Sequence, residues 1–139
     1  MNKILIFVVM LTSAGMNAQP ADYPVYENHN MVDYGPLVFR YVVGRAIDPG
    51  GAPLPGGNIG LFTEQDHRLV ASTRTDAEGN FHLHGVAPGH YRLVAHFDGC
   101  CPANVRVRLA RWPRGGVGRR LVIHGVVGAI DTCSYGSYK

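Results

Sequence analysis

The residues best suited to chemistry in this sequence are arginines concentrated in its last third. No Asp or Glu occurs between Gly99 and Ile130, and one tryptophan stands among the basic side chains. The set comprises Arg106, Arg108, Arg111, Trp112, Arg114, Arg119 and Arg120. A guanidinium fork pairs with phosphate or carboxylate, and an indole ring offers a stacking surface. The stretch predicts contact with an anionic partner: lipid head groups, lipopolysaccharide, an acidic glycan or an acidic protein. The alternative is a solvated face, partly paired internally, with Trp112 filling one end of the fold.

Three of the seven histidines have types and spacing that suit a metal ion. His82 and His84 are two residues apart, so their side chains project from the same face of a strand. His96 would lie beside them if segments 80–84 and 90–97 formed a hairpin, and three imidazoles would then suit Cu or Zn. The alternative is a set of ordinary solvent-facing histidines, because no carboxylate or cysteine stands at a fixed spacing. No other cofactor is expected.

The three cysteines are Cys100, Cys101 and Cys133. A disulfide from either member of the adjacent pair to Cys133 would close a loop of about 33 residues, which is worth roughly 3–4 kcal/mol if unstrained. Such a bridge would tie the tail to the body of the protein and leave one thiol over. Three unpaired, buried thiols are the alternative interpretation, and the sequence leaves the pairing partner open.

The first residues indicate export. Lys3 precedes an apolar run, Ile4–Leu11, that is too short to span a bilayer, and small residues follow. Residues 1–18 are therefore predicted to be a signal peptide, and the mature protein to be secreted or periplasmic with no membrane span. Prolines in residues 19–36 disfavour a helix and predict an extended arm. This arm is either a tether or a strand donated to a neighbouring copy in a homo-oligomer or fibre.

From Leu37 onward, β-branched and aromatic runs alternate with Gly, Pro and Asp. Strands are predicted near residues 37–47, 57–63, 68–74, 80–84, 90–97, 104–110 and 119–127. Within them apolar and polar residues alternate, as in Phe81-His82-Leu83-His84. One apolar and one polar face per strand is what two packed sheets require. The pattern predicts a seven-stranded antiparallel β-sandwich over residues 37–127, followed by a tail at 128–139.

Chain length and net charge limit the possible classes of function. The chain has 139 residues, which suits one domain, and a formal net charge of +3. That mild charge argues against a dedicated nucleic-acid binder.

Three sequence segments resemble the signatures of carboxypeptidase regulatory-like domains. They are GRAID (Gly44–Asp48) with GAPLPGGNIGL (Gly51–Leu61), then TDAEGNF (Thr75–Phe81), then VAPGHY (Val86–Tyr91). The resemblance implies a transthyretin-like (prealbumin-like) Greek-key sandwich and an accessory role without shared catalytic residues. Asp48 and Asp76 would hydrogen-bond their own turns.

The resemblance leaves an enzyme as the third choice. Transthyretin-like sandwiches include a hydrolase of 5-hydroxyisourate, which uses catalytic His and Arg and a Tyr-Arg-Gly-Ser terminus. This chain ends Tyr135-Gly136-Ser137-Tyr138-Lys139, and Val42–Ile47 contains no histidine. A stabilising Lys–Asn isopeptide bond is also disfavoured, since the lysines are Lys3 and Lys139.

We expect an exported, non-catalytic binding or structural module with a protein or glycan partner in the cell envelope; the runner-up is a self-assembling subunit.

Overall fold

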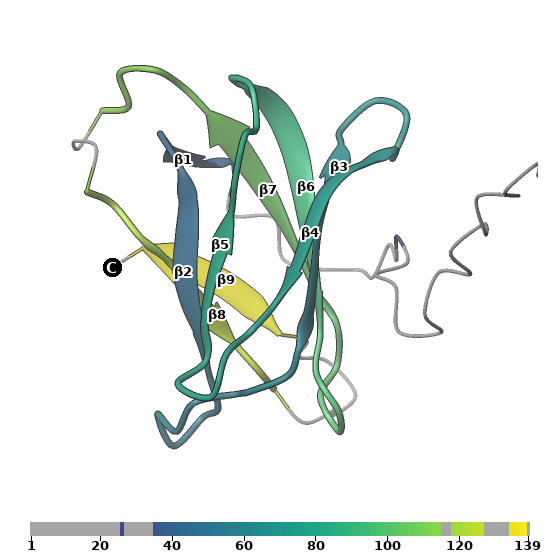
Figure 1. The fold of residues 1–139 in the computed structure, drawn as a ribbon, viewed down its shortest axis with the longest axis vertical. Coiled ribbons are helices and arrows are strands. Elements are labelled where there is room, and N and C mark those ends of the chain that lie inside the picture. Colours follow the sequence, from purple (N-terminus) through teal and green to yellow (C-terminus); the bar gives the residue numbers. More distant parts are fainter. Residues whose placement is uncertain (1–25, 27–34, 115–117, 127–133, 139) are drawn as a thin grey trace, which may run out of the picture.

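Alternating apolar side chains from Leu37 onward produce strands that pack as two layers (Figure 1). The computed structural model describes residues 26, 35–114, 118–126 and 134–138. The predicted signal peptide and most of the predicted arm lie outside these residues. Within the described part of the chain, no helix has the length and apolar character to cross a membrane.

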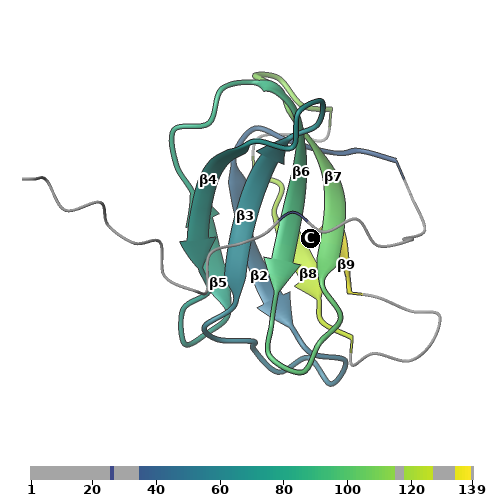
Figure 2. The same ribbon diagram turned by 90° about the vertical axis from the view of Figure 1, so that its right-hand side faces the viewer.

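The two layers are a five-stranded and a four-stranded sheet (Figure 2). The five-stranded sheet has the order β1-β7-β6-β3-β4: β1 Leu37–Phe39, β7 Ala103–Leu109, β6 Gly89–His96, β3 Asn58–Thr63 and β4 Leu69–Arg74. The four-stranded sheet has the order β5-β2-β8-β9: β5 Asn80–Leu83, β2 Val42–Ile47, β8 Leu121–His124 and β9 Tyr135–Tyr138. The predicted all-β sandwich is confirmed.

The core lies between the sheets and contains the residues that the alternation selects. Leu61 and Leu93 of the five-stranded sheet are fully buried, as are Leu121 and Ile123 of the four-stranded sheet. Phe81 is buried too, while His82 beside it is exposed. Burial of such apolar side chains contributes about 1.5–3 kcal/mol each, which makes this layer the main source of stability.

The strand count and pairing differ from the sequence prediction. The described residues form nine strands, and β1 pairs with β7, and β2 with β8, in parallel. The predicted strand 37–47 is two strands in different sheets, because the chain bends at Arg40 and Tyr41. Residues 135–138, assigned to the tail, form β9 and complete the four-stranded sheet. The chain thus crosses between layers at Arg40–Tyr41, which places these two side chains at one end of the sandwich.

The family-like turns have the predicted geometry. Asp76 Oδ1 accepts hydrogen bonds from the backbone N–H groups of Glu78 (3.0 Å) and Asn80 (2.8 Å). Gly79 in the same turn has a φ of +76°. Asp48 Oδ1 accepts from the N–H of Ala52 at 2.8 Å. Both aspartates therefore hold turns, as the resemblance implies.

The outer face of the five-stranded sheet carries an aromatic contact from the predicted arm. The Tyr26 ring stacks on His67, with centroids 3.8 Å apart, and meets Phe62 edge-on at 5.5 Å. Phe62 points outward, since its neighbour Leu61 points into the core, yet it is buried. The described residue of the arm therefore lies against this chain's own sheet.

Candidate anion-binding site

The bend between β1 and β2 meets the segment that follows β7 at one end of the sandwich. The Arg40 guanidinium lies 5.2 Å from the centre of the Tyr41 ring and 5.5 Å from the centre of the Trp112 ring. Trp112 is 81% exposed and Tyr41 is 53% exposed. These contacts form a ladder of Tyr41, Arg40 and Trp112, in which the cation is held between two aromatic faces that remain open to ligands.

A cavity of about 550 Å³ lies on one side of this ladder, and we name it the Trp112 pocket. Its walls are Val38, Arg108, Ala110, Trp112, Pro113, Arg114 and Arg119. Three guanidinium groups thus surround a space that no carboxylate of the described residues lines. An anion entering it would meet charge-assisted hydrogen-bond donors, which are the strong kind.

The C-terminal strand β9 positions one of these arginines. The Arg119 guanidinium lies 4.1 Å from the centre of the Tyr138 ring. Tyr138 is fixed in turn, because its hydroxyl oxygen accepts a hydrogen bond from the N–H of Val38 at 2.6 Å and its ring packs 5.2 Å from that of Phe39. The pocket is therefore built by three segments distant in sequence: β1, the segment after β7, and β9.

A second cavity, of about 410 Å³, lies on the other side of the ladder and is named the Tyr41 pocket. Its polar lining is Arg40, Tyr41, His82 and His84, and its other walls are mainly apolar. The His82 and His84 rings are 3.7 Å apart between centroids. The prediction that these two side chains project together is confirmed.

The predicted arginine set divides in the structure. Arg108, Arg114, Arg119 and Trp112 gather at the Trp112 pocket. Arg111 and Arg120 are exposed and line neither named pocket.

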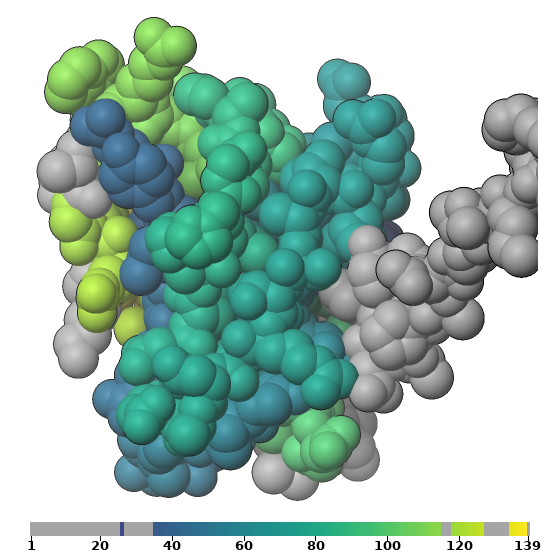
Figure 3. Space-filling view, in the orientation of Figure 1, coloured from purple at the N-terminus to yellow at the C-terminus, as the bar shows by residue number. Residues whose placement is uncertain are grey.

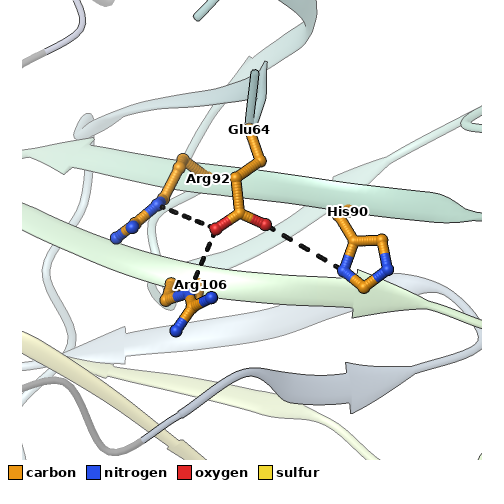
Figure 4. A network of polar contacts seen from close by, with 4 residues as sticks. All are labelled: Glu64, His90, Arg92 and Arg106. Atoms are coloured by element: carbon orange, nitrogen blue, oxygen red, sulfur yellow. Dashed lines mark hydrogen bonds and ion pairs between the residues drawn. The ribbon is translucent and has the colours of Figure 1, made fainter.

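Arg106 belongs to a different group on the outer face of the five-stranded sheet (Figure 4). Its Nε donates to Glu64 Oε1 at 3.1 Å, and Arg92 Nε lies 3.7 Å from the same oxygen. His90 Nδ1 is 4.0 Å from Glu64 Oε2. One carboxylate thus contacts both arginines, and Arg106 is paired with Glu64 and does not line the Trp112 pocket.

The predicted three-histidine metal site does not assemble. β5 pairs with β2 and β6 pairs with β3 and β7, so the hairpin that would bring His96 to His82 and His84 is absent among these strands. Across the described ranges, no group of three or more His, Cys, Asp and Glu side chains is placed to hold a metal ion. The reason is topological: the link from β5 to β6 crosses between the two sheets.

The adjacent cysteines have different surroundings. Cys100 is a free thiol packed against the core, and burial raises its pKa, with a smaller contribution from Asp48. Cys101 pairs by its backbone with Val126, and the buried Ser134 donates its hydroxyl hydrogen to the Cys101 carbonyl. Cys133 lies outside the described residues, so the predicted disulfide stays a prediction.

Sequence reasoning missed Arg40 and Tyr41. They fall inside a continuous run predicted as one strand, without Gly or Pro to mark the bend. Their role becomes visible only when the two sheets are assembled.

Comparison with solved structures shows the same fold in an enzyme. The 5-hydroxyisourate hydrolase of Klebsiella pneumoniae matches 71% of this chain and 96% of its own, with a TM-score of 0.50 and 18% identity. The 3-chlorocatechol 1,2-dioxygenase of Rhodococcus opacus 1CP matches 77% of this chain and 60% of its own, with a TM-score of 0.41 and 15% identity. No curated protein sequence matches the chain significantly.

A family model gives the more specific result. The model of the carboxypeptidase regulatory-like domain matches residues 41–112, which is more than half of the chain. The match spans all three segments that carry the sequence resemblance, and it runs from the ladder residue Tyr41 to the ladder residue Trp112. The chain belongs to the carboxypeptidase regulatory-like domain family.

Proposed function

We propose that this protein is an exported, non-catalytic binding module that holds an anionic partner in the Trp112 pocket. The observation that carries the proposal is a cavity with three guanidinium groups, an exposed indole and no carboxylate in its walls. Arginine forks bind carboxylate or phosphate with paired hydrogen bonds, which gives orientation as well as affinity.

The contrast with the outer-face arginines supports this choice. Arg92 and Arg106 already share the carboxylate of Glu64, so an external anion would have to compete with an internal one. In the part of the chain that the structure describes, no acidic side chain lines the Trp112 pocket, so its positive charge is available to a ligand. Long-range attraction from such a patch also speeds the encounter with an anionic partner.

The chemistry of the walls supports a non-catalytic role. Among the described residues, no hydroxyl, thiol, imidazole or carboxyl side chain lines the Trp112 pocket. A group able to attack a substrate or exchange a proton at neutral pH is therefore lacking there. The hydrolase neighbour is 18% identical, a level at which the likeness concerns the fold alone.

Export and a Cys101–Cys133 disulfide belong to the same proposal. Ser134, which follows Cys133 directly, is hydrogen-bonded to the Cys101 carbonyl, whereas Cys100 packs against the core. This contact favours Cys101 over Cys100 as the partner of Cys133. Non-reducing mass spectrometry of the exported protein is expected to give a Cys101–Cys133 peptide; a peptide linking Cys100 to Cys133 would contradict the pairing.

Ion-exchange retention tests the binding site. The double variant Arg114→Ser/Arg119→Ser is expected to leave a polyanionic resin at lower salt and to bind the polyanion roughly tenfold more weakly or worse, since hydrogen bonds to charged groups contribute about 1.5–3 kcal/mol each. A matched double variant, Arg68→Ser/Arg74→Ser, removes equal charge from β4 and the turn before it. Equal losses in both variants would contradict a localised site.

A further inference from the structure

The two pockets adjoin through the ladder. Arg40 lines the Tyr41 pocket, while its guanidinium lies 5.5 Å from the Trp112 ring in the wall of the other pocket. In Figure 3, the blue segment around the β1–β2 bend lies beside the green segment after β7 and the teal region around β5, at the upper end of the molecule. Arg40 thus joins the linings of the two pockets into one surface.

Polar nitrogen-bearing groups and aromatic rings alternate along this surface. The order is the imidazoles of His82 and His84, the Tyr41 phenol, the Arg40 guanidinium, the Trp112 indole, and the guanidinium groups beyond it. Within residues 35–114, 118–126 and 134–138, no Asp or Glu lines either pocket. A ligand that follows the surface would therefore meet hydrogen-bond donors for anions and flat apolar faces in turn.

We propose that the surface binds a linear acidic polysaccharide, whose chain runs from the Trp112 pocket through the ladder into the Tyr41 pocket. Such a chain repeats carboxylate, sulfate or phosphate groups and the flat C–H faces of its sugar rings, which matches the alternation of nitrogen-bearing groups and aromatic rings. A small anion needs only one pocket. A lipid surface is broad and flat, and it would touch the protruding Trp112 without entering two neighbouring cavities.

This inference rests on the proposed function, because the Trp112 pocket supplies the first contact. Testing the further inference separately from the proposed function requires probes of two lengths. Digalacturonate is the short probe, for one pocket, and octagalacturonate is the long probe, for both. The chain contains one tryptophan, so fluorescence from Trp112 reports occupancy at the ladder directly. A fully methyl-esterified octamer serves as the uncharged match.

Octagalacturonate is expected to bind at least tenfold more tightly than digalacturonate, because the second pocket is engaged within the same complex. The double variant His82→Asn/His84→Asn is expected to remove this gain while leaving digalacturonate affinity within about twofold. The control His67→Asn changes a histidine that lines neither pocket and should preserve the gain. The esterified octamer is expected not to bind.

Each of the remaining outcomes contradicts a specific claim. Equal affinity of dimer and octamer, or a gain that survives in the His82→Asn/His84→Asn variant, overturns the elongated site and leaves the proposed function standing. Absence of binding by either probe to the wild-type protein, together with resin retention that ignores Arg114 and Arg119, overturns the proposed function. Binding to vesicles of anionic phospholipid but not to octagalacturonate would identify a lipid surface instead and would also overturn the polysaccharide.

Discussion

Gly44 shows how single residues fix the approach of the strands that frame the site. It lies buried in β2, between β5 and β8. A Cβ at this position would overlap the Leu121 carbonyl and would sit 2.7 Å from the Phe81 ring. The backbone of a parallel neighbour cannot move away without breaking its hydrogen bonds, so the absence of a side chain is required here.

The substitution Gly44→Ala is therefore expected to lower the free energy of unfolding by about 3 kcal/mol, a typical cost of overpacking. Urea denaturation with an unchanged m-value would measure the loss. Gly118→Ala is the control, because a Cβ there meets open space. Equal stability of the two variants would show that β2 and β8 are not as close as described.

The charge of Glu64 decides whether the outer-face arginines can bind anions. Glu64→Gln removes the carboxylate from Arg92 and Arg106 while preserving the size of the side chain. We expect this variant to be retained on a polyanionic resin to higher salt than wild type, because two guanidinium groups are released. Its stability should fall by less than about 1 kcal/mol, since the pairs are partly exposed and screened. Unchanged retention would mean that Glu64 does not neutralise these arginines.

At the scale of elements, β9 depends on side-chain contacts with β8. His124 Nε2 and Ser137 Oγ are hydrogen-bonded at 2.8 Å, and the His124 ring stacks on Tyr135 at 4.5 Å. The buried Ser134 also accepts a hydrogen bond from the N–H of Val126 at 2.9 Å. These contacts hold the strand that carries Tyr138 and, through it, Arg119.

Burial lowers the pKa of His124 from its ordinary value of 6.5, which gives β9 a pH dependence. Above that value the histidine is neutral in both states, and stability is complete. As the pH falls, the unfolded chain takes up the proton first, so the free energy of unfolding decreases until the folded form is also protonated. Urea denaturation between about pH 7 and pH 5 should show this decline, and His124→Gln should reduce it. A decline of the same size in His124→Gln would assign the effect to other groups.

How well each strand could be predicted depended on the strength of its local sequence pattern. Strands such as β5 and β6 were predictable, because their apolar residues alternate and Gly-rich turns bound them. β9 was not, since Tyr-Gly-Ser-Tyr has no apolar alternation and its position depends on β8. The bend at Arg40 was also missed, because no local residue marks it. It becomes visible only when the two sheets are assembled.

The same distinction applies to the site. The arginine-rich set was visible in the sequence, and four of its seven members, one in β7 and three after it, line the Trp112 pocket. Arg106 is paired instead with Glu64, which is 42 residues distant in the chain. Long-range pairing of this kind leaves no local trace in composition or spacing.

In the whole molecule, two groups of arginines differ in whether a carboxylate is paired with them. The group that lines the Trp112 pocket is open, and the group around Glu64 is paired with that carboxylate (Figure 4). A mild total charge of +3 conceals this contrast. Function is therefore expected to reside at the end where β1, β9 and the segment after β7 meet.

Nuclear magnetic resonance titration with digalacturonate tests this claim most directly, because the Nε–H signals of each arginine and of Trp112 are observed separately. The account predicts shifts of Trp112, Arg114 and Arg119 that saturate together, while Arg92 and Arg106 stay unchanged. Saturable shifts at Arg92 and Arg106, with Trp112 unmoved, would contradict it.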